Sequence, residues 1–341
     1  MEHFAAVDIG ATKTTASVCS REGILARVYQ LTRKTGDNGT VPRQVDFLIG
    51  HVCEQAGISR GKIAAVGVST ASPFVKRGGK LALAAPNICG GLASARREAA
   101  NDWKEIPLEE ELAAICPGLR IANDCVSAAA AERSFGAGRG EDDLLYVTWS
   151  TGIGGGAFVD GHLLTGKNNN ALHLGHIAMS WEYGSGPLCG CGGRAHLEAM
   201  TSGLAIAREY GAEPPEVFRR CREGEKRAGQ LIRRIAVVMA VGLYNAVALL
   251  DTRLIVVGGS VSRNWDLLEP LVTDEFYRGF PVLTREVVFR HSELDQYLGD
   301  MAALSLVMPE DWNSDWQLRK PWQRSPALVV LEPDVGTGGT G

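Results

Sequence analysis

A strand–glycine turn–strand pattern that occurs twice constrains the fold of this chain most. The first copy runs from Phe4 to Cys19 and turns at Gly10, and the second runs from Leu144 to Gly161 and turns at Gly152. In each copy an apolar run precedes and follows a turn of small residues. Because glycine has no side chain, an anion can lie directly against the backbone N–H groups of such a turn. Each turn is therefore a candidate anion-binding site.

Strand-like and helix-like segments alternate along the rest of the chain, which predicts an α/β protein. The repeated glycine turn indicates a duplicated domain whose two lobes close over a nucleotide. Towards the C-terminus we expect one more strand at Val282–Phe289 and a short helix at Gly299–Leu306. The segment after Pro309 contains three tryptophans and several prolines, and its pattern gives no clear structural expectation.

The composition is that of a soluble globular protein, and it excludes several classes. The 341 residues carry a formal net charge of −4 with a pI near 6.0, which argues against a nucleic-acid-binding protein. The longest apolar run, Ile235–Leu250, is shorter than a membrane span and contains Asn245, so we expect a core helix and no membrane partner. The eight cysteines are mostly scattered, and no signal-like segment opens the chain, so we expect a cytoplasmic protein.

Two thiols and two imidazoles lie close together in the sequence and form a candidate metal site. Cys189 and Cys191 are separated by one glycine, His196 follows, and His176 lies upstream. Such an N₂S₂ set suits tetrahedral Zn²⁺, and four protein ligands would make the site structural. The alternative is a glycine-rich loop with free thiols.

Two carboxylates follow buried strands. Asp8 precedes the first glycine turn and is a candidate for holding hydrated Mg²⁺, although a hairpin with a solvated Asp gives the same pattern. Asp124 follows the strand Leu119–Ala122 and precedes an Ala-rich helix. This is a common functional position in an α/β fold and also a common position for a helix N-cap.

Together these segments resemble the ROK family of sugar kinases and repressors, which belongs to the hexokinase/actin/Hsp70 superfamily. The resemblance covers the chain to about residue 306. The segments that carry it are Asp8-Ile9-Gly10-Ala11-Thr12-Lys13, Asn123-Asp124, Thr151-Gly152-Ile153-Gly154-Gly155-Gly156, Gly258-Gly259, and His176 followed by Cys189-Gly190-Cys191-Gly192-Gly193-Arg194-Ala195-His196-Leu197-Glu198.

The resemblance implies a two-lobed, actin-like (ribonuclease H-like) ATPase fold with duplicated βββαβα-type domains and an active-site cleft between the lobes. The N-terminal lobe would comprise residues 1–122, with residues 299–330 packing back on it. The C-terminal lobe would comprise residues 123–298 and contain the zinc loop, and residues 331–341 would form a disordered tail.

The resemblance also implies roles for individual residues of an ATP- and Mg²⁺-dependent sugar kinase. Asp124 would be the general base, and Asp8 would hold Mg²⁺ through water. The expected ATP-binding residues are Asp8, Gly10, Ala11, Thr12, Lys13, Thr151, Gly152, Gly154, Gly258 and Gly259. The expected sugar-binding residues are Asn87, Asn123, Asp124, His173, His176 and Glu198. The expected zinc ligands are His176, Cys189, Cys191 and His196.

This chain departs from the family pattern at two positions. His196 stands where the family has a third zinc Cys, and an imidazole still ligates zinc. His173 stands where the family's Glu-x-Gly-His motif has a Glu that contacts sugar hydroxyls, so the pocket loses a strong acceptor. The substrate could therefore be a hexose, an N-acylhexosamine or a polyol, and a non-catalytic sugar sensor is a further alternative.

The family's repressors carry an added helix-turn-helix, whereas this chain starts at the first strand, so we expect no nucleic-acid partner. The expected partners are a sugar and ATP, and by analogy with the family a second copy in a homodimer or larger homo-oligomer.

Overall fold

The structure is a computed structural model, and it describes residues 2–92, 101–180, 182 and 184–332 of the chain. All but the first two residues of the expected disordered tail lie outside the described residues. The chain divides into two compact units. Unit 1 comprises the residues up to Asp124 and those from Gly299 onward, and unit 2 comprises Cys125–Leu298.

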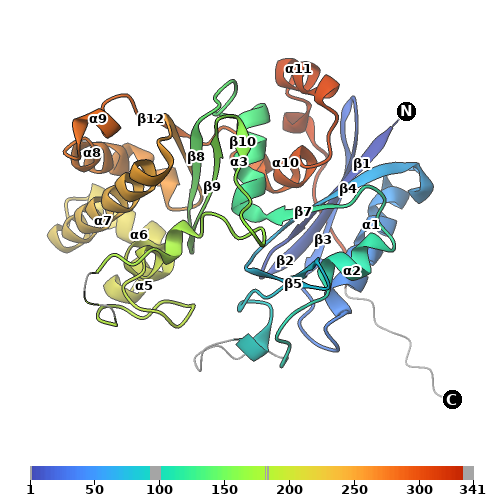
Figure 1. Cartoon of the computed structure of the whole chain (residues 1–341), viewed down its shortest axis with the longest axis horizontal. Helices are drawn as coiled ribbons and strands as arrows, with labels where there is room; N and C mark the ends of the chain where they lie inside the picture. Colours follow the sequence, from blue (N-terminus) through green and yellow to red (C-terminus); the bar gives the residue numbers. More distant parts are fainter. Residues whose placement is uncertain (1, 93–100, 181, 183, 333–341) are drawn as a thin grey trace. The chain divides into compact units, whose positions relative to one another are not determined.

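Unit 1 is built on a six-stranded sheet with the order β13-β3-β2-β1-β4-β7 (Figure 1). Its strands are β1 (His3–Ile9), β2 (Lys13–Ser20), β3 (Gly23–Leu31), β4 (Ile63–Thr70), β7 (Arg120–Asn123) and β13 (Val329–Val330). The first three strands are antiparallel, whereas β4 and β7 run parallel to β1. A separate hairpin, β5 (Phe74–Arg77) with β6 (Lys80–Leu83), follows β4.

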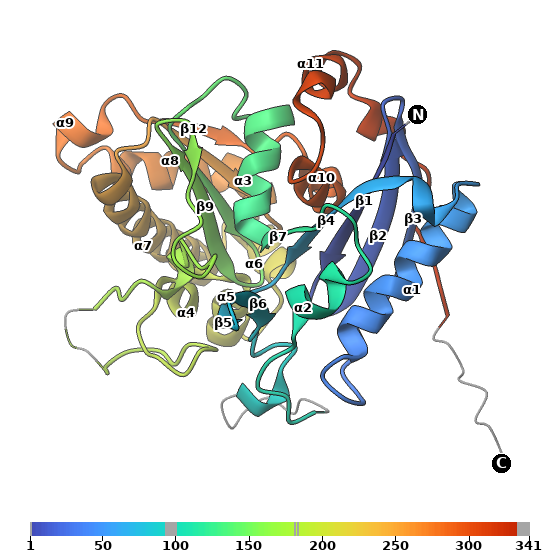
Figure 2. The same ribbon diagram turned by 45° about the vertical axis from the view of Figure 1, so that its right-hand side comes forward.

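Helices cover both faces of this sheet, which is why nearly every residue of β1 is buried. The amphipathic helix α1 (Thr40–Gln55) packs Val45, Leu48 and Val52 into the same core cluster as Ala5 and Val7 (Figure 2). The short α2 (Leu108–Ala113) adds its buried leucines to this cluster. On β4, a Cβ at Gly67 would lie 2.0 Å from the carbonyl oxygen of Ala303 in α10 (Leu298–Ser305). Only glycine allows α10 to pack this closely on the strand.

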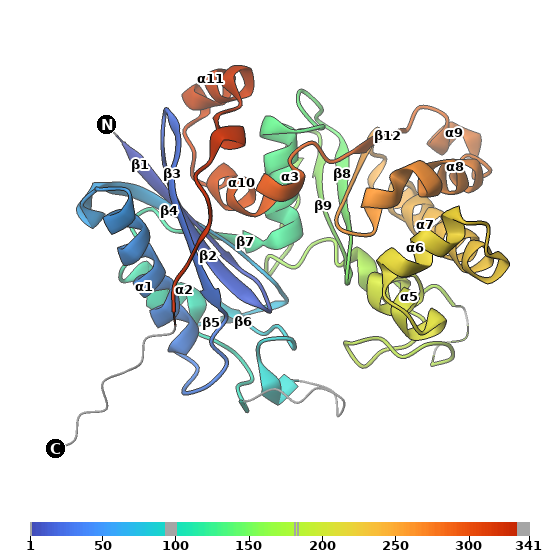
Figure 3. The ribbon, with the colours of Figure 1, turned by 180° about the vertical axis from the view of Figure 1, so that it is seen from behind.

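The C-terminal segment, whose local pattern predicts no structure, is a part of unit 1. It forms α11 (Glu310–Arg319), a 3-10 turn η6 (Pro321–Arg324) and β13, which pairs in parallel with β3 at the sheet edge (Figure 3). Trp312, Trp316 and Trp322 are all buried. The ring of Trp312 packs edge-on against Phe4 with ring centroids 5.2 Å apart.

Unit 2 is built on a five-stranded sheet with the order β10-β9-β8-β11-β12. Its strands are β8 (Leu144–Trp149), β9 (Ile153–Val159), β10 (His162–Leu163), β11 (Leu254–Gly258) and β12 (Val288–His291). Three antiparallel strands are again followed by two strands parallel to the first. Without β13 the sheet of unit 1 has the same order, so the predicted duplication of the domain is confirmed.

The helix α3 (Asp124–Phe135) packs on one face of this sheet. The helices on the other face lie around α7 (Lys226–Leu250) and are α4 (Leu197–Thr201), α5 (Gly203–Tyr210), α6 (Pro214–Arg222), α8 (Trp265–Phe276) and α9 (Pro281–Thr284). The helix α7 is long and apolar enough to cross a membrane. Its apolar face nevertheless packs into the main core cluster of the unit through Ile235, Met239 and Leu243, as a core helix does.

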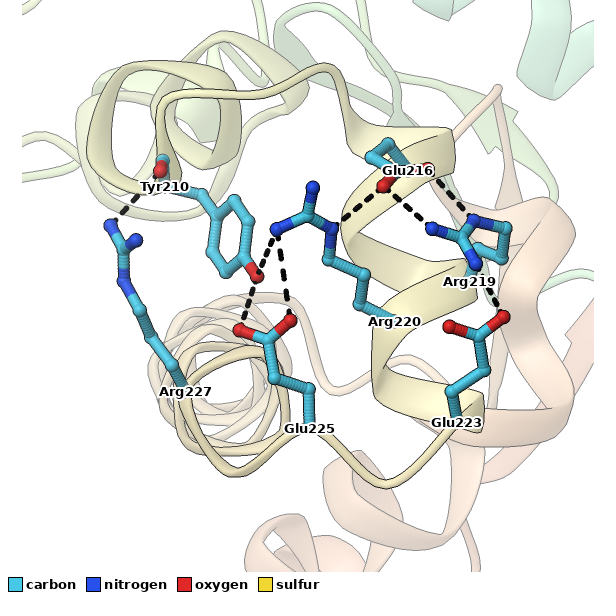
Figure 4. Close-up of polar contacts among 7 residues, drawn as sticks. All are labelled: Tyr210, Glu216, Arg219, Arg220, Glu223, Glu225 and Arg227. Carbon is cyan, nitrogen blue, oxygen red and sulfur yellow. Dashed lines mark hydrogen bonds and ion pairs between the residues drawn. The ribbon is translucent and has the colours of Figure 1, made fainter.

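A polar cluster joins α5, α6 and the start of α7 (Figure 4). The hydroxyl of Tyr210 donates a hydrogen bond of 2.5 Å to Glu225. Arg220 donates to Glu216 at 2.7 Å and reaches Glu225 at 3.7 Å, while Arg227 donates to the carbonyl of Tyr210 at 2.9 Å. The cluster fixes these three helices to one another at the surface of unit 2.

The expectation of a strand over Val282–Phe289 is wrong for all but its last two residues. Pro281 occupies the first position of α9, and its fixed φ suits a helix start. The strand β12 begins only at Val288, where the chain pairs with β11. The helix expected at Gly299–Leu306 is confirmed as α10.

Candidate active site

The first glycine turn joins β1 to β2 in unit 1. The N–H of Gly10 donates to the carbonyl of Lys13 at 3.0 Å, and the hydroxyl of Thr32 on the neighbouring loop donates to the carbonyl of Gly10 at 2.7 Å. The ammonium group of Lys13 lies 5.9 Å from the ring centre of Tyr29. The turn that contains Gly10, Ala11, Thr12 and Lys13 is thus held at both ends by hydrogen bonds.

Asp8 lies on β1 just before this turn, and most of its side chain is removed from water. The pKa of its carboxyl group is raised to about 7, mainly by burial and also by the negative charges of Asp124 and Asp300. A hydrogen bond from Ser69 and the charge of Lys13 oppose this shift. The charges of Asp124 and Asp300 therefore oppose ionisation of Asp8, and a cation beside Asp8 would relieve this repulsion.

The raised pKa of Asp8 predicts that the free energy of unfolding decreases as the pH rises. Folding takes up a proton between pH 3.8 and about 7, so in metal-free protein the contribution of Asp8 to stability is lost as the pH rises through this window. We expect the free energy of unfolding of Asp8→Asn, relative to that of the wild type, to increase by about 2–4 kcal/mol as the pH is raised from 4 to 8. Urea unfolding of both proteins in EDTA measures this difference. If the difference in free energy of unfolding between the two proteins stays constant with pH, the raised pKa of Asp8 is contradicted.

Asn123 and Asp124 lie at the end of β7 and the start of α3. The side-chain amide of Asn123 donates to Ser72 Oγ at 2.7 Å and to Asp124 Oδ1 at 2.8 Å. Asp124 is exposed and occupies the first turn of α3, where the helix dipole favours a negative charge. Its carboxylate is thus oriented by a neighbour and open to a substrate.

Asn87 follows the β5–β6 hairpin of unit 1. Its Oδ1 atom is buried and has no hydrogen-bond partner among the described residues. A buried acceptor without a donor costs about 1–3 kcal/mol. A hydroxyl group bound at this position would supply the missing donor.

The second glycine turn joins β8 to β9 in unit 2, and α4 and α5 hold its backbone. The N–H groups of Gly203 and Leu204 donate to the carbonyls of Ser150 and Thr151 at 2.8 and 3.3 Å. The indole N–H of Trp149 donates to the carbonyl of Thr201 at 2.8 Å.

The Gly258-Gly259 loop lies directly beside this turn. The N–H of Val261 donates to the carbonyl of Trp149 at 2.9 Å, and the hydroxyls of Ser150 and Ser260 lie 2.9 Å apart. Gly259 has a left-handed φ of +99°, and a Cβ on it would lie 2.6 Å from the carbonyl oxygen of Trp149. The structure therefore brings together the two loops of unit 2 that the sequence assigns to ATP.

The four predicted zinc ligands also come together in unit 2. The ligand atoms of His176, Cys189, Cys191 and His196 all lie within 4.8 Å of one another. Cys189 Sγ is 3.7 Å from His176 Nδ1, and Cys191 Sγ is 3.2 Å from His196 Nδ1. Tetrahedral zinc with bonds of about 2.0 Å to nitrogen and 2.3 Å to sulfur would separate such atoms by about 3.6 Å. The donor set and its spacing therefore fit zinc.

Glycine is required in the loop that carries these ligands. Gly192 has a left-handed φ of +92°, and a Cβ on Gly193 would lie 2.4 Å from the ring of His196. Burial raises the pKa of the Cys189 thiol to about 12 in the absence of a metal. Metal binding at this site would thus release a proton.

His173 precedes the 3-10 turn η3 (Leu174–His176), and its ring stacks on that of His176 with centroids 5.6 Å apart. Burial lowers the pKa of His173, and the positive charge of His176 lowers it further, whereas Glu198 opposes both. Glu198 lies on the first turn of α4, two residues after the candidate zinc ligand His196.

Several residues that act on the predicted site have no signal in the sequence. Ser69 bonds to Asp8 through the pairing of β4 with β1. Asp300 lies in α10 and pairs with Arg27 at 2.6 Å. Ser72 holds Asn123. Each is distant in sequence from its partner, and no local motif marks it.

The repeated sheet topology, with a glycine turn after the first strand of each unit, defines the two-lobed actin-like ATPase fold. The family model described as "ROK family" matches residues 4–307. The chain belongs to the ROK family.

Relatives of known activity support this assignment. The chain is 32% identical over 277 residues to a glucokinase of Pyrobaculum calidifontis, covering 79% of this chain and 83% of that protein. It is also 32% identical over 273 residues to an N-acetylmannosamine kinase of Yersinia pseudotuberculosis, covering 78% and 86% respectively.

A solved structure shows the same fold. The ROK glucokinase of Streptomyces griseus in complex with glucose and AMPPNP aligns with a TM-score of 0.68 at 26% identity, covering 88% of this chain and 97% of that one.

Proposed function

We propose that this protein is an ATP-dependent carbohydrate kinase that transfers the γ-phosphate of ATP to a hydroxyl of a hexose or hexose derivative. The observation that carries the proposal is the arrangement in unit 1 of an oriented, exposed carboxylate, Asp124, whose charge acts on a second carboxylate, Asp8, beside a glycine turn. A base and a phosphate-side carboxylate are the groups that phosphoryl transfer to an alcohol requires.

In this proposal Asp124 accepts the proton of the attacking hydroxyl, and Asn123 keeps the carboxylate in position. The turn after β1 and the loops at Gly152 and Gly258-Gly259 hold the nucleotide, because phosphoryl transfer depends mainly on positioning and charge stabilisation. Asp8 holds hydrated Mg²⁺, which neutralises phosphate charge when bound.

The sugar-binding residues in this proposal are Asn87, Asn123, Asp124, His173, His176 and Glu198. Asn87 supports it most directly, since its buried Oδ1 needs a donor that a sugar hydroxyl can supply. His173 offers an imidazole in place of the family's carboxylate, and we infer that it selects among sugars.

Substrate selection by His173 is tested by ADP release from Mg·ATP across hexoses, N-acylhexosamines and polyols. We expect one sugar to be preferred by the wild type and His173→Glu to change the order of kcat/KM among the sugars, because a different polar group then needs a partner. Equal loss of kcat/KM for every sugar would show that His173 does not select.

We propose that His176, Cys189, Cys191 and His196 hold a structural zinc ion. Their donor types and spacing support this, and four protein ligands leave no open position for chemistry. The ion would fix the loop from Cys189 to His196 and the position of His176.

Zinc ligation by His196 predicts different results for two substitutions. We expect about one zinc per chain in the wild type and in His196→Cys, which restores a family ligand, but a marked loss in His196→Ala. We also expect EDTA to lower the thermal midpoint of the first two proteins. Elemental analysis and thermal unfolding measure both effects. A wild type that stays below a tenth of an equivalent after dialysis against zinc would contradict the proposal.

We further propose that the protein acts as a soluble cytoplasmic enzyme. An assembly as a homodimer or larger homo-oligomer follows only by analogy with the family.

A further inference from the structure

We propose that Glu198 is a positioning residue for the turn between β8 and β9, and that it connects the metal-ligand cluster to the nucleotide end of the site. This inference rests on the proposed function and extends it, since Glu198 was expected only to contact sugar. All the contacts that carry it lie within unit 2.

One oxygen of the Glu198 carboxylate contacts the turn between β8 and β9, and the other lies beside the metal-ligand cluster. Its Oε2 accepts a hydrogen bond of 3.0 Å from the backbone N–H of Ile153, the first residue of β9. Its Oε1 lies 3.7 Å from Sγ of Cys189, one of the four candidate metal ligands. A charged acceptor on a backbone N–H forms one of the stronger hydrogen bonds in a protein.

Gly152 shows how closely this carboxylate approaches the turn. The φ of Gly152 lies outside the left-handed region, so its backbone does not require glycine. A Cβ at this position would, however, lie 2.6 Å from Glu198 Oε2. The glycine is thus needed because Glu198 occupies the space that a side chain would take.

A second contact connects the same two regions. Gly175 belongs to η3, next to the candidate ligand His176, and a Cβ on it would lie 2.2 Å from the carbonyl oxygen of Ile153 and 3.2 Å from Cβ of Glu198. The turn η3, which carries His176, and Glu198, which lies beside Cys189, therefore both reach the start of β9. Fixing the ligand cluster should fix Glu198 and, through it, the turn.

A double-mutant cycle tests this coupling. The measured quantity is the dissociation constant of a non-hydrolysable ATP analogue with Mg²⁺, determined by calorimetry without sugar for the wild type, Glu198→Ala, Gly152→Ala and the double variant. We expect each single substitution to weaken binding about tenfold, the size expected for one lost charged hydrogen bond. The double variant should bind no more weakly than Gly152→Ala alone, since the added methyl no longer meets a carboxylate.

Glu198→Gln is the matched control, because its amide oxygen can still accept from Ile153. We expect it to bind the analogue within about threefold of the wild type, while thermal unfolding shows that all variants are folded. Unchanged analogue binding by Glu198→Ala, with an effect only on the KM for sugar, would overturn the inference. So would additive effects in the double variant.

Hydrogen exchange gives a readout that does not depend on nucleotide binding. We expect removal of the metal to speed exchange in the segment 150–158 of the wild type, and to do so much less in Glu198→Ala, where the segment already exchanges fast. If removal of the metal leaves the exchange rate of this segment unchanged in both proteins, the inference is overturned even if the protein is an active kinase. If the wild type fails to bind the analogue but shows this exchange coupling, the proposed function fails and the positioning role stands.

Discussion

Asp124→Asn should reduce kcat by about 10²–10⁴-fold while leaving the affinity for an ATP analogue within about twofold. The substitution keeps the shape of the side chain but removes the group that takes the proton from the attacking hydroxyl. Asn123 donates to Asp124 Oδ1 at 2.8 Å, and the oxygen that an Asn retains can still accept this bond, so the start of α3 should keep its structure. Coupled measurement of ADP release and calorimetric titration with the analogue separate the two effects.

The matched control for this prediction is Asp274→Asn. Asp274 is an exposed carboxylate on α8 whose partner is Arg278, at 2.8 Å. We expect its removal to leave kcat unchanged. Normal turnover by Asp124→Asn would rule out Asp124 as the base.

Trp316→Ala should destabilise the protein by about 3–5 kcal/mol, the usual cost of removing a buried large aromatic ring. Trp316 is fully buried, its ring stacks on Trp322 with centroids 6.2 Å apart, and its indole N–H donates to the carbonyl of Arg21 at 2.9 Å. The substitution thus removes packing and leaves the carbonyl of Arg21 with one donor fewer.

Leu318→Ala provides the control on the same helix, because Leu318 is 85% exposed. We expect it to change stability by less than about 0.5 kcal/mol. Denaturant unfolding followed by circular dichroism measures both variants without depending on tryptophan fluorescence. Equal stability of the two variants would show that the segment after residue 307 is not part of the folded core of unit 1.

The parts of the fold that local pattern determines could be predicted from the sequence. The two strand–glycine turn–strand copies led to the duplicated sheet because an antiparallel pair with a tight turn is defined by neighbouring residues. The strand expected over Val282–Phe289 begins only at Val288, because Pro281 starts a helix at the beginning of this segment. The local pattern could not show what the C-terminal tryptophans pack against, because their partners are the distant Phe4 and the carbonyl of Arg21.

In the candidate site, too, some features follow from local sequence and others arise only from tertiary packing. The cluster of His176, Cys189, Cys191 and His196 was recognisable because its spacing along the chain matches that of zinc ligands. The hydrogen bond of Glu198 to Ile153 and the charge of Asp300 near Asp8 arise from tertiary packing and leave no local signal. The residues with intrinsic chemistry could therefore be predicted from the sequence, whereas the contacts that position them or modify their charge could not.

The most direct test of the central claim is whether phosphate is transferred from ATP to sugar in equal amounts with ADP formed. The wild type would be incubated with Mg·ATP and the sugar preferred in the substrate panel, and ADP and sugar phosphate would be quantified by mass spectrometry. We predict one sugar phosphate for each ADP, with neither formed by Asp124→Asn. Sugar binding by the wild type without formation of any sugar phosphate would contradict the kinase and indicate a sugar-sensing protein.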